Sequence, residues 1–120
     1  MRKLLIAINS EIITERLRSA LPQYEIHTCS NGFQALDSLN ALRPNVLIID
    51  LCLLGLDGLT VLKETEFLPS AVLALTTLAS QPVLDAAAEA GAQDVVLLPC
   101  SFEHLLKHLD ALIEKVPSAD

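Results

Sequence analysis

The chain alternates five times between a short strand-like run and a segment whose apolar residues recur at helical spacing. The strand-like runs span residues 3–8, 24–29, 45–50, 71–76 and 94–98. Most are nearly continuous apolar runs, which is typical of strands buried on both faces. Repeated strand–helix alternation implies a parallel sheet with helices on both sides. We therefore expect a single α/β domain with a doubly wound parallel sheet, in which the more polar run 24–29 lies near an edge.

Proline, glycine and capping residues punctuate the helical segments. Residues 30–32 (Ser-Asn-Gly) are compatible with a hairpin turn, but the apolar spacing after them favours a capped helix. The third helix is expected to use Leu59, Leu62 and Phe67 as its apolar face and to end before Pro69. The last helix is expected to begin after Ser101 and to run through Val116.

Composition excludes several classes of function. The 120 residues include 15 acids against 8 bases, a net charge of −7 that repels nucleic-acid phosphates, so we expect no direct nucleic-acid binding. No apolar stretch reaches the roughly 18 residues that span a bilayer, and the start lacks a signal-peptide pattern, so we expect a cytoplasmic protein without membrane contact. The three cysteines lack metal-ligand spacing and are expected to be reduced, mostly buried thiols.

One charged residue stands out in the third strand-like run. Asp50 is the only charge in residues 46–56, among leucines, isoleucines and a valine. An ionised carboxylate without a partner is too costly to bury in such surroundings. We therefore expect Asp50 to end the strand and to face the crevice outside the carboxyl ends of the strands, where ligands bind in open α/β sheets.

Five segments resemble the receiver (CheY-like) domain of two-component response regulators, and their order covers nearly all of residues 1–116. They are residues 44–50, 53–59, 75–77, 90–94 and 98–99. The resemblance implies a flavodoxin-like (βα)5 sheet of order 2-1-3-4-5. It also implies that Asp50 is the phosphoacceptor, modified by a histidine kinase with Mg²⁺ bound, and that Thr76 is the hydroxyl that bonds the phosphoryl group.

The chain departs from the family pattern at the positions around that acceptor. The two adjacent acids after the first strand are replaced by Ile8 and Asn9, and the alternative register, Asn9-Ser10, contains no acid either. The family lysine before the last strand's proline is replaced by Leu98, and the aromatic switch residue by Val95. Leu54 stands where the family's loop proline is found, although Gly55 remains.

These departures affect metal binding and phosphoryl transfer. Mg²⁺ requires hard oxygen ligands, and the remaining weak candidates are Asp50, the Asn9 amide oxygen and the Cys52 backbone carbonyl. Phosphoryl transfer depends on charge neutralisation by the metal, so we expect no metal and no cofactor. If Ile8 and Leu98 meet beside Asp50, they fill the former pocket with apolar side chains.

We favour an atypical, non-enzymatic receiver that signals through dimerisation or partner docking, without phosphorylation. It would form the N-terminal regulatory part of a transcriptional regulator, with residues 117–120 beginning a linker or tail. The alternative is a conventional receiver phosphorylated on Asp50 with Mg²⁺. A third hypothesis, a flavodoxin-like flavin binder, is disfavoured because residues 9–14 contain no glycine and carry an acid.

The expected homodimer interface is the face formed by the fourth helix, the fifth strand and the last helix, which receiver domains often use. Its residues are Ala86, Ala87, Leu97, Leu105, Leu109 and Leu112. His104 and His108 lie four residues apart on the last helix, where such a pair is able to bind a metal. No zinc-protease glutamate accompanies them, and a solvated helix face is the preferred interpretation.

Overall fold

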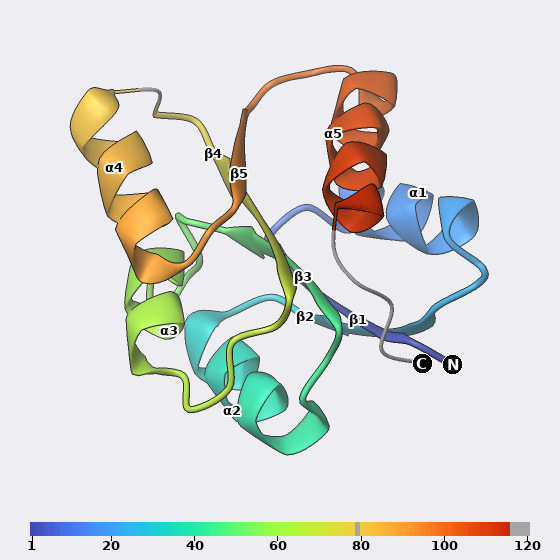
Figure 1. Cartoon of the computed structure of the whole chain (residues 1–120), viewed down its shortest axis with the longest axis horizontal. Helices are drawn as coiled ribbons and strands as arrows, with labels where there is room; N and C mark the ends of the chain where they lie inside the picture. Colours follow the sequence, from blue (N-terminus) through green and yellow to red (C-terminus); the bar gives the residue numbers. More distant parts are fainter. Residues whose placement is uncertain (79, 116–120) are drawn as a thin grey trace.

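The computed structural model describes residues 1–78 and 80–115 and contains a five-stranded parallel sheet (Figure 1). Its strands are β1 (Lys3–Ala7), β2 (Glu25–Cys29), β3 (Val46–Asp50), β4 (Ala71–Thr76) and β5 (Asp94–Leu97). They are arranged in the order β2-β1-β3-β4-β5. The flavodoxin-like order implied by the resemblance is therefore confirmed, and the polar run lies at the edge as β2.

Within the described part of the chain, five helices cover the sheet: α1 (Glu11–Ala20), α2 (Gly32–Leu42), α3 (Gly58–Glu64), α4 (Gln81–Ala90) and α5 (Phe102–Glu114). In Figure 1, α1 and α5 lie on one side of the sheet, and α2, α3 and α4 lie on the other. Two hydrophobic clusters correspond to these layers. One joins Leu17 of α1 to Leu105 and Leu109 of α5. The other joins Leu39 of α2 to Val61 of α3 and Ala87 of α4.

The central strands show why nearly continuous apolar runs are needed. In β3, Val46 and Ile48 belong to the cluster under α1 and α5, whereas Leu47 and Ile49 belong to the opposite cluster. Successive strand residues point to opposite faces, so both faces of β3 are buried. Burial of each such side chain contributes roughly 1.5–3 kcal/mol to stability. The strand therefore has no room for a polar residue before its last position.

Polar caps start the helices at the carboxyl edge of the sheet. Ser10, Asn31, Asp57 and Ser101 each accept a hydrogen bond from a backbone N–H in the first turn of the helix that follows. The favoured capped helix after residues 30–32 is confirmed as α2. A Cβ on Gly58 would collide with the Asp50 carbonyl, so glycine is required for α3 to start against the end of β3.

The expected third helix is too long. The structure ends α3 at Glu64, and Phe67 lies in the following loop instead of on the helix. The Asn40 side chain accepts a hydrogen bond from the Glu66 N–H at 3.0 Å, and the Thr65 hydroxyl donates to the Phe67 carbonyl at 2.8 Å. These bonds hold the loop in place of another helical turn.

The expected end of the last helix, Val116, and the expected tail 117–120 lie outside the described residues. Within residues 1–78 and 80–115, no helix has the length and hydropathy to cross a membrane.

Candidate functional site

Asp50 is the last residue of β3 and is half-buried at the carboxyl edge of the sheet. Its Oδ1 accepts a hydrogen bond from the Cys52 backbone N–H at 2.8 Å. Ile48 and Ile49, just before it, are fully buried. The expectation that Asp50 ends the strand is therefore confirmed, and the carboxylate is held by the loop that follows.

Asn9 connects a second loop to the same place. Its side-chain amide nitrogen donates to the Cys52 backbone carbonyl at 3.1 Å. No hydrogen bond joins Asn9 to Asp50 within residues 1–78 and 80–115. Both backbone groups of Cys52 are thus hydrogen-bonded, one to each of the two polar side chains of the site.

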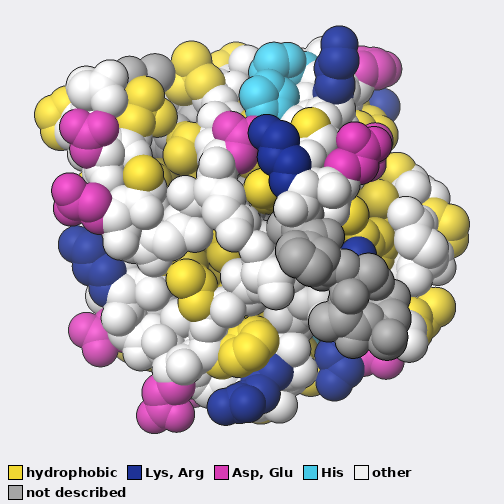
Figure 2. All heavy atoms as spheres, viewed as in Figure 1, with side chains coloured by type: hydrophobic (Ala, Val, Ile, Leu, Met, Phe, Trp, Pro, Cys, Tyr) yellow, Lys and Arg dark blue, Asp and Glu magenta, His cyan; other side chains and the backbone are white. Residues whose placement is uncertain are grey.

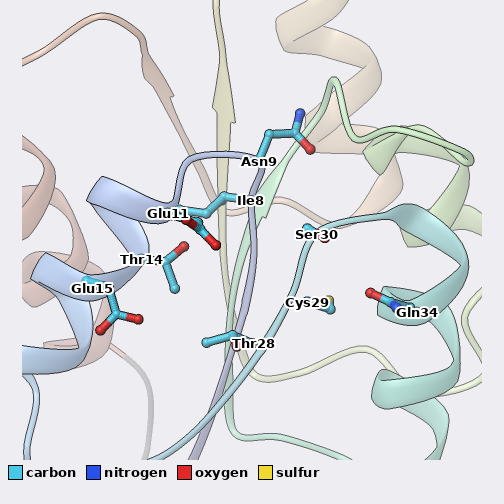
Figure 3. Close-up of a pocket in the computed structure, with 9 residues that line it drawn as sticks. All are labelled: Ile8, Asn9, Glu11, Thr14, Glu15, Thr28, Cys29, Ser30 and Gln34. Atoms are coloured by element: carbon cyan, nitrogen blue, oxygen red, sulfur yellow. The ribbon is translucent and has the colours of Figure 1, made fainter.

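The structure also settles which residues follow β1 at the site. Ile8 is only 4% exposed and packs in the cluster under α1 and α5, while Asn9 is exposed. Figure 3 shows the Ile8 and Asn9 side chains leaving the chain in different directions, with Ile8 towards α1. Ser10 is occupied as the cap of α1. Asn9 alone, of these three, reaches the Asp50 loop.

Thr76 ends β4 next to β3 and is buried, with 2% of its surface exposed. Its hydroxyl accepts from the Leu78 N–H at 3.0 Å and lies 3.4 Å from the Leu78 carbonyl. No hydrogen bond joins Thr76 to Asp50 in the part of the chain that the structure describes. The hydroxyl is turned into the loop before α4, and its role as a switch stays a prediction.

The family's lysine and aromatic-switch positions, Leu98 and Val95, carry aliphatic side chains. Leu98 directly follows β5 and packs, half-buried, against the cluster that contains Ile8. Val95 packs on the opposite face of the sheet, against the cluster under α2, α3 and α4. Ile8 and Leu98 therefore lie in one apolar layer, as expected if they fill the place of charged side chains.

The donor set at the edge does not fit the divalent cation of receiver domains. At the adjacent ends of β1 and β3, Asp50 is the one acid among the described residues 8–10 and 50–52, and the Cys52 carbonyl is already bonded to an amide N–H. Across residues 1–78 and 80–115, no group of three or more His, Cys, Asp or Glu side chains is placed to hold a metal ion. Mg²⁺ is usually held by one or two carboxylates together with waters or phosphate oxygens. The two positions that supply carboxylates in the family are an isoleucine in the core and a hydrogen-bonded amide.

The expected dimer residues are divided between the surface and the core. Leu97 is 48% exposed and Ala86 is partly exposed. Four others are buried in the two clusters and do not provide an accessible face: Ala87, Leu105, Leu109 and Leu112. The prediction is corrected for these four, because the apolar stripe of α5 covers one face of the sheet and Ala87 of α4 packs in the cluster on the other face.

Histidines on α5 form a contact that the sequence did not predict. Nδ1 of His108 lies 2.7 Å from Oδ2 of Asp94 at the start of β5, and the His104 and His108 rings are 4.5 Å apart. Figure 2 shows histidine side chains beside Lys and Arg side chains at the top of this view. Two adjoining hollows of about 470 and 370 Å³ lie along this side of α5 and share His108 and Ala111. The basic residues Lys107 and Lys115 also line them. The i, i+4 histidine spacing was the only sequence signal for this patch.

A polar cleft of about 280 Å³ opens between α1 and α2, and sequence reasoning missed it (Figure 3). Its lining includes Glu11, Thr14 and Glu15 from α1 and Cys29 at the end of β2. Burial raises the pKa of the Cys29 thiol to about 11, so this thiol is protonated at neutral pH. The expectation of mostly buried cysteines is wrong: Cys52 is exposed, and Cys29 and Cys100 are only partly buried.

Comparisons with known proteins agree with this architecture. The family model described as "Response regulator receiver domain" matches residues 4–110. The response regulator MprA of Mycobacterium avium (strain 104) is 30% identical over 124 residues, covering 98% of this chain and 54% of that protein. The chain thus spans about half the length of this curated relative.

Solved structures give the same result. A putative response regulator from Chloroflexus aurantiacus J-10-fl has a TM-score of 0.77 and 28% identity, covering 94% of this chain and 98% of that chain. The receiver domain of the sensor histidine kinase PA1611 from Pseudomonas aeruginosa PAO1, solved with a magnesium ion in its active site cleft, has a TM-score of 0.76 and 23% identity, covering 94% and 98%. At that identity the second likeness shows the fold alone. With a family model matched over most of its length, the chain belongs to the response regulator receiver domain family.

Proposed function

We propose that this chain is an atypical receiver domain that transmits signals by protein contact and does not depend on phosphorylation. The observation that carries the proposal is the hydrogen bond from the Asn9 amide to the Cys52 carbonyl beside the lone carboxylate of Asp50. The group beside Asp50 is therefore the neutral amide of Asn9, whereas phosphoryl transfer requires a cation that neutralises the charge on the phosphoryl oxygens. The same geometry is the reason to expect no metal and no cofactor.

The charges around Asp50 support this proposal. Phosphoryl transfer is catalysed mainly by positioning and by neutralising the charge on the phosphoryl oxygens. The four loops at this edge, residues 8–12, 50–58, 76–80 and 97–101, contain three acids and no Lys or Arg. A phosphoryl group on Asp50 would add negative charge to that surface without a cation in these loops. Position 98, the lysine position of the family, instead packs a half-buried aliphatic side chain against the core.

The alternative function is a conventional receiver that is phosphorylated on Asp50 by a histidine kinase with Mg²⁺. Two observations favour it: Asp50 is half-exposed at the strand end, and Thr76 ends the neighbouring strand. The MprA relatives are named response regulators, which also agrees with it. Under this alternative the Asn9 amide would have to leave Cys52 and present its oxygen to the metal.

The signalling contact is proposed to lie on the face formed by α4, β5 and α5, in a homodimer or with another protein. Leu97 and Ala86 remain accessible there, and Lys107 and Lys115 line hollows on α5 and its C-cap. α4 carries the exposed acids Asp85 and Glu89, which are complementary in charge to Lys107 and Lys115. A two-fold pair would bring the acids of one copy to the bases of the other.

The place of the domain in a longer protein is also a proposal. MprA relatives are about twice as long as this chain, which supports residues 1–116 as the regulatory domain of a cytoplasmic transcriptional regulator and 117–120 as the beginning of a linker. Because this domain has a net charge of −7, any contact of the longer protein with DNA is proposed to be made by another part of that protein.

Intact-protein mass spectrometry distinguishes the two functions. The purified chain is incubated with Mg²⁺ and a small phosphodonor such as acetyl phosphate, next to the Asp50→Asn variant. We expect no phosphoryl adduct that depends on Asp50. A stable adduct that appears in the wild type and disappears in Asp50→Asn would establish the conventional function instead. A conventional receiver domain treated in parallel verifies that the donor is active.

A further inference from the structure

We propose that the Asn9 side chain takes the place of the divalent cation and fastens the loop after β1 to the loop after β3. This inference deepens the proposed function and rests on the same site. It assigns Asn9 a positioning role: its N–H group bridges two loops that a metal ion bridges in receiver domains with a charged site. The loops after β1 and β3 are then held together at the carboxyl edge of the sheet at any metal concentration.

The contacts form one continuous connection. The Asn9 Nδ2 donates to the Cys52 carbonyl at 3.1 Å, and the Cys52 N–H donates to Asp50 Oδ1 at 2.8 Å. Asn9 follows β1 and Cys52 follows β3, and these strands are neighbours in the sheet. The connection therefore crosses from one strand end to the next and reaches the carboxylate.

The chemistry of the amide fixes its orientation. A carbonyl oxygen accepts hydrogen bonds only, so the amide must turn its nitrogen, and not its oxygen, towards Cys52. An aspartate at position 9 has no donor when ionised, and two oxygens at this separation repel each other. A bridging cation removes that repulsion. Adjacent ligands of an octahedral Mg²⁺ with bonds of about 2.1 Å lie about 3.0 Å apart, close to the spacing of 3.1 Å found here.

This comparison predicts that one substitution converts the site. In Asn9→Asp, the carboxylates at positions 9 and 50 and the Cys52 carbonyl form a set of three oxygen donors for a divalent cation. Without the cation, that variant lacks the bridging bond and gains a like charge near Asp50. The wild type has neither defect, so its stability is expected to be indifferent to the cation.

Thermal unfolding of matched variants tests the proposal. The wild type, Asn9→Asp, Asn9→Ala and the double variant Asn9→Asp/Asp50→Asn are each melted in EDTA and in millimolar Mg²⁺ or Mn²⁺. Asn45→Asp is the charge control, because Asn45 lies at the opposite edge of the sheet and its Oδ1 accepts from the Lys3 N–H, as an aspartate also would. A melt at raised NaCl separates specific binding from general screening.

We expect the cations to leave the Tm of the wild type, Asn9→Ala and Asn45→Asp unchanged. In EDTA, Asn9→Ala and Asn9→Asp should melt about 3–6 °C below the wild type, the loss expected for one hydrogen bond in a domain of this size. Cations should restore Asn9→Asp, and the additional Asp50→Asn change should abolish the recovery. Mn²⁺ should broaden the amide NMR signals of residues 50–52 in Asn9→Asp alone.

Two results would overturn the role of Asn9. One is an Asp50-dependent rise in the wild-type Tm with Mg²⁺ as large as that of Asn9→Asp, and the other is an Asn9→Ala variant as stable as the wild type. The phosphodonor experiment remains separate. A wild type that is phosphorylated on Asp50 but indifferent to cations in the melt would refute the proposed function while leaving the bridging role of Asn9 intact.

Discussion

Replacing Ile8 with aspartate restores one acid of the family pair at a position that this chain has incorporated into its core. Ile8 is 4% exposed and packs in the cluster with the residues of α1 and α5. The variant Ile8→Asp therefore tests whether position 8 still has room for an acid or is now required to be apolar by the packing of the core. We expect a severe loss of stability and not a regained metal site.

The magnitude follows from two contributions. Loss of the buried isoleucine side chain costs about 2 kcal/mol. Burying a carboxyl group without a partner costs at least about 2–3 kcal/mol more, either as a charge or as a carboxyl that must be protonated. The sum of about 4–5 kcal/mol is comparable to the whole stability of a marginal domain, about 5–15 kcal/mol. With an m-value of about 2 kcal/mol per molar urea, the middle of the range for small proteins, the midpoint should fall by about 2–2.5 M.

Urea unfolding followed by circular dichroism measures this change. Ile12→Asp is the matched control, because Ile12 lies close to Ile8 in sequence but is 76% exposed in the first turn of α1, so its replacement should cost no more than about 0.5 kcal/mol. A cost below about 1 kcal/mol for Ile8→Asp would refute the assignment of Ile8 to the core. Adding Leu98→Lys extends the test: if the two side chains meet, the double variant should lose less stability than the sum of the single variants.

Three further predictions concern other parts of the molecule. Asp57→Ala should cost about 1 kcal/mol, because Asp57 Oδ1 caps α3 through the Thr60 N–H at 2.9 Å. Hydrogen bonds from Thr60 hold the pKa of Asp57 below its usual value. The stability that the ionised carboxylate contributes is therefore present above about pH 4 and is lost as the pH falls through the lowered folded-state pKa. Between pH 3 and 7, the urea midpoint of the wild type should rise relative to that of Asp57→Asn as the pH rises. In timed iodoacetamide labelling at pH 8 with peptide mapping, the exposed Cys52 should react well before Cys29, whose pKa is raised to about 11, and faster labelling of Cys29 would contradict its burial. If the face containing Leu97 forms the dimer, Leu97→Lys should lower the molar mass measured by light scattering towards that of the monomer, without changing the Tm by more than a few degrees; an unchanged dimer would place the interface elsewhere.

Sequence periodicity was sufficient for the fold because each central strand is buried on both faces. β3 has no polar residue before Asp50, and its alternate residues pack in two different clusters. Such a pattern leaves few arrangements other than a sheet between helix layers. The prediction of α3 was less accurate because Phe67 continued its apolar spacing. The Asn40 side chain, 26 residues away in sequence, bonds the Glu66 N–H and holds the loop after α3, which local spacing does not reveal.

The same limit applies to the site. The positions of Asp50, Asn9 and Thr76 at neighbouring strand ends were predictable from the strand boundaries and from the resemblance. Their hydrogen-bond partners were not, because a backbone group of Cys52 and the loop residue Leu78 supply them. Burial of the α5 stripe was misjudged for a related reason. A broad apolar stripe fits both a sheet-facing and a partner-facing surface, and only the packing shows that Leu105 and Leu109 face the sheet.

The surroundings of the Asp50 carboxylate explain how this receiver fold accommodates the absence of charged neighbours. An acidic residue beside an empty cation site would be destabilised by its own desolvation and by any second acid. Here the second acid is missing as well as the lysine, and the Cys52 N–H supplies a hydrogen bond to the remaining carboxylate. The coordinated loss of both signs of charge leaves no unpaired partner behind, whereas loss of the lysine alone would have left three carboxylates together.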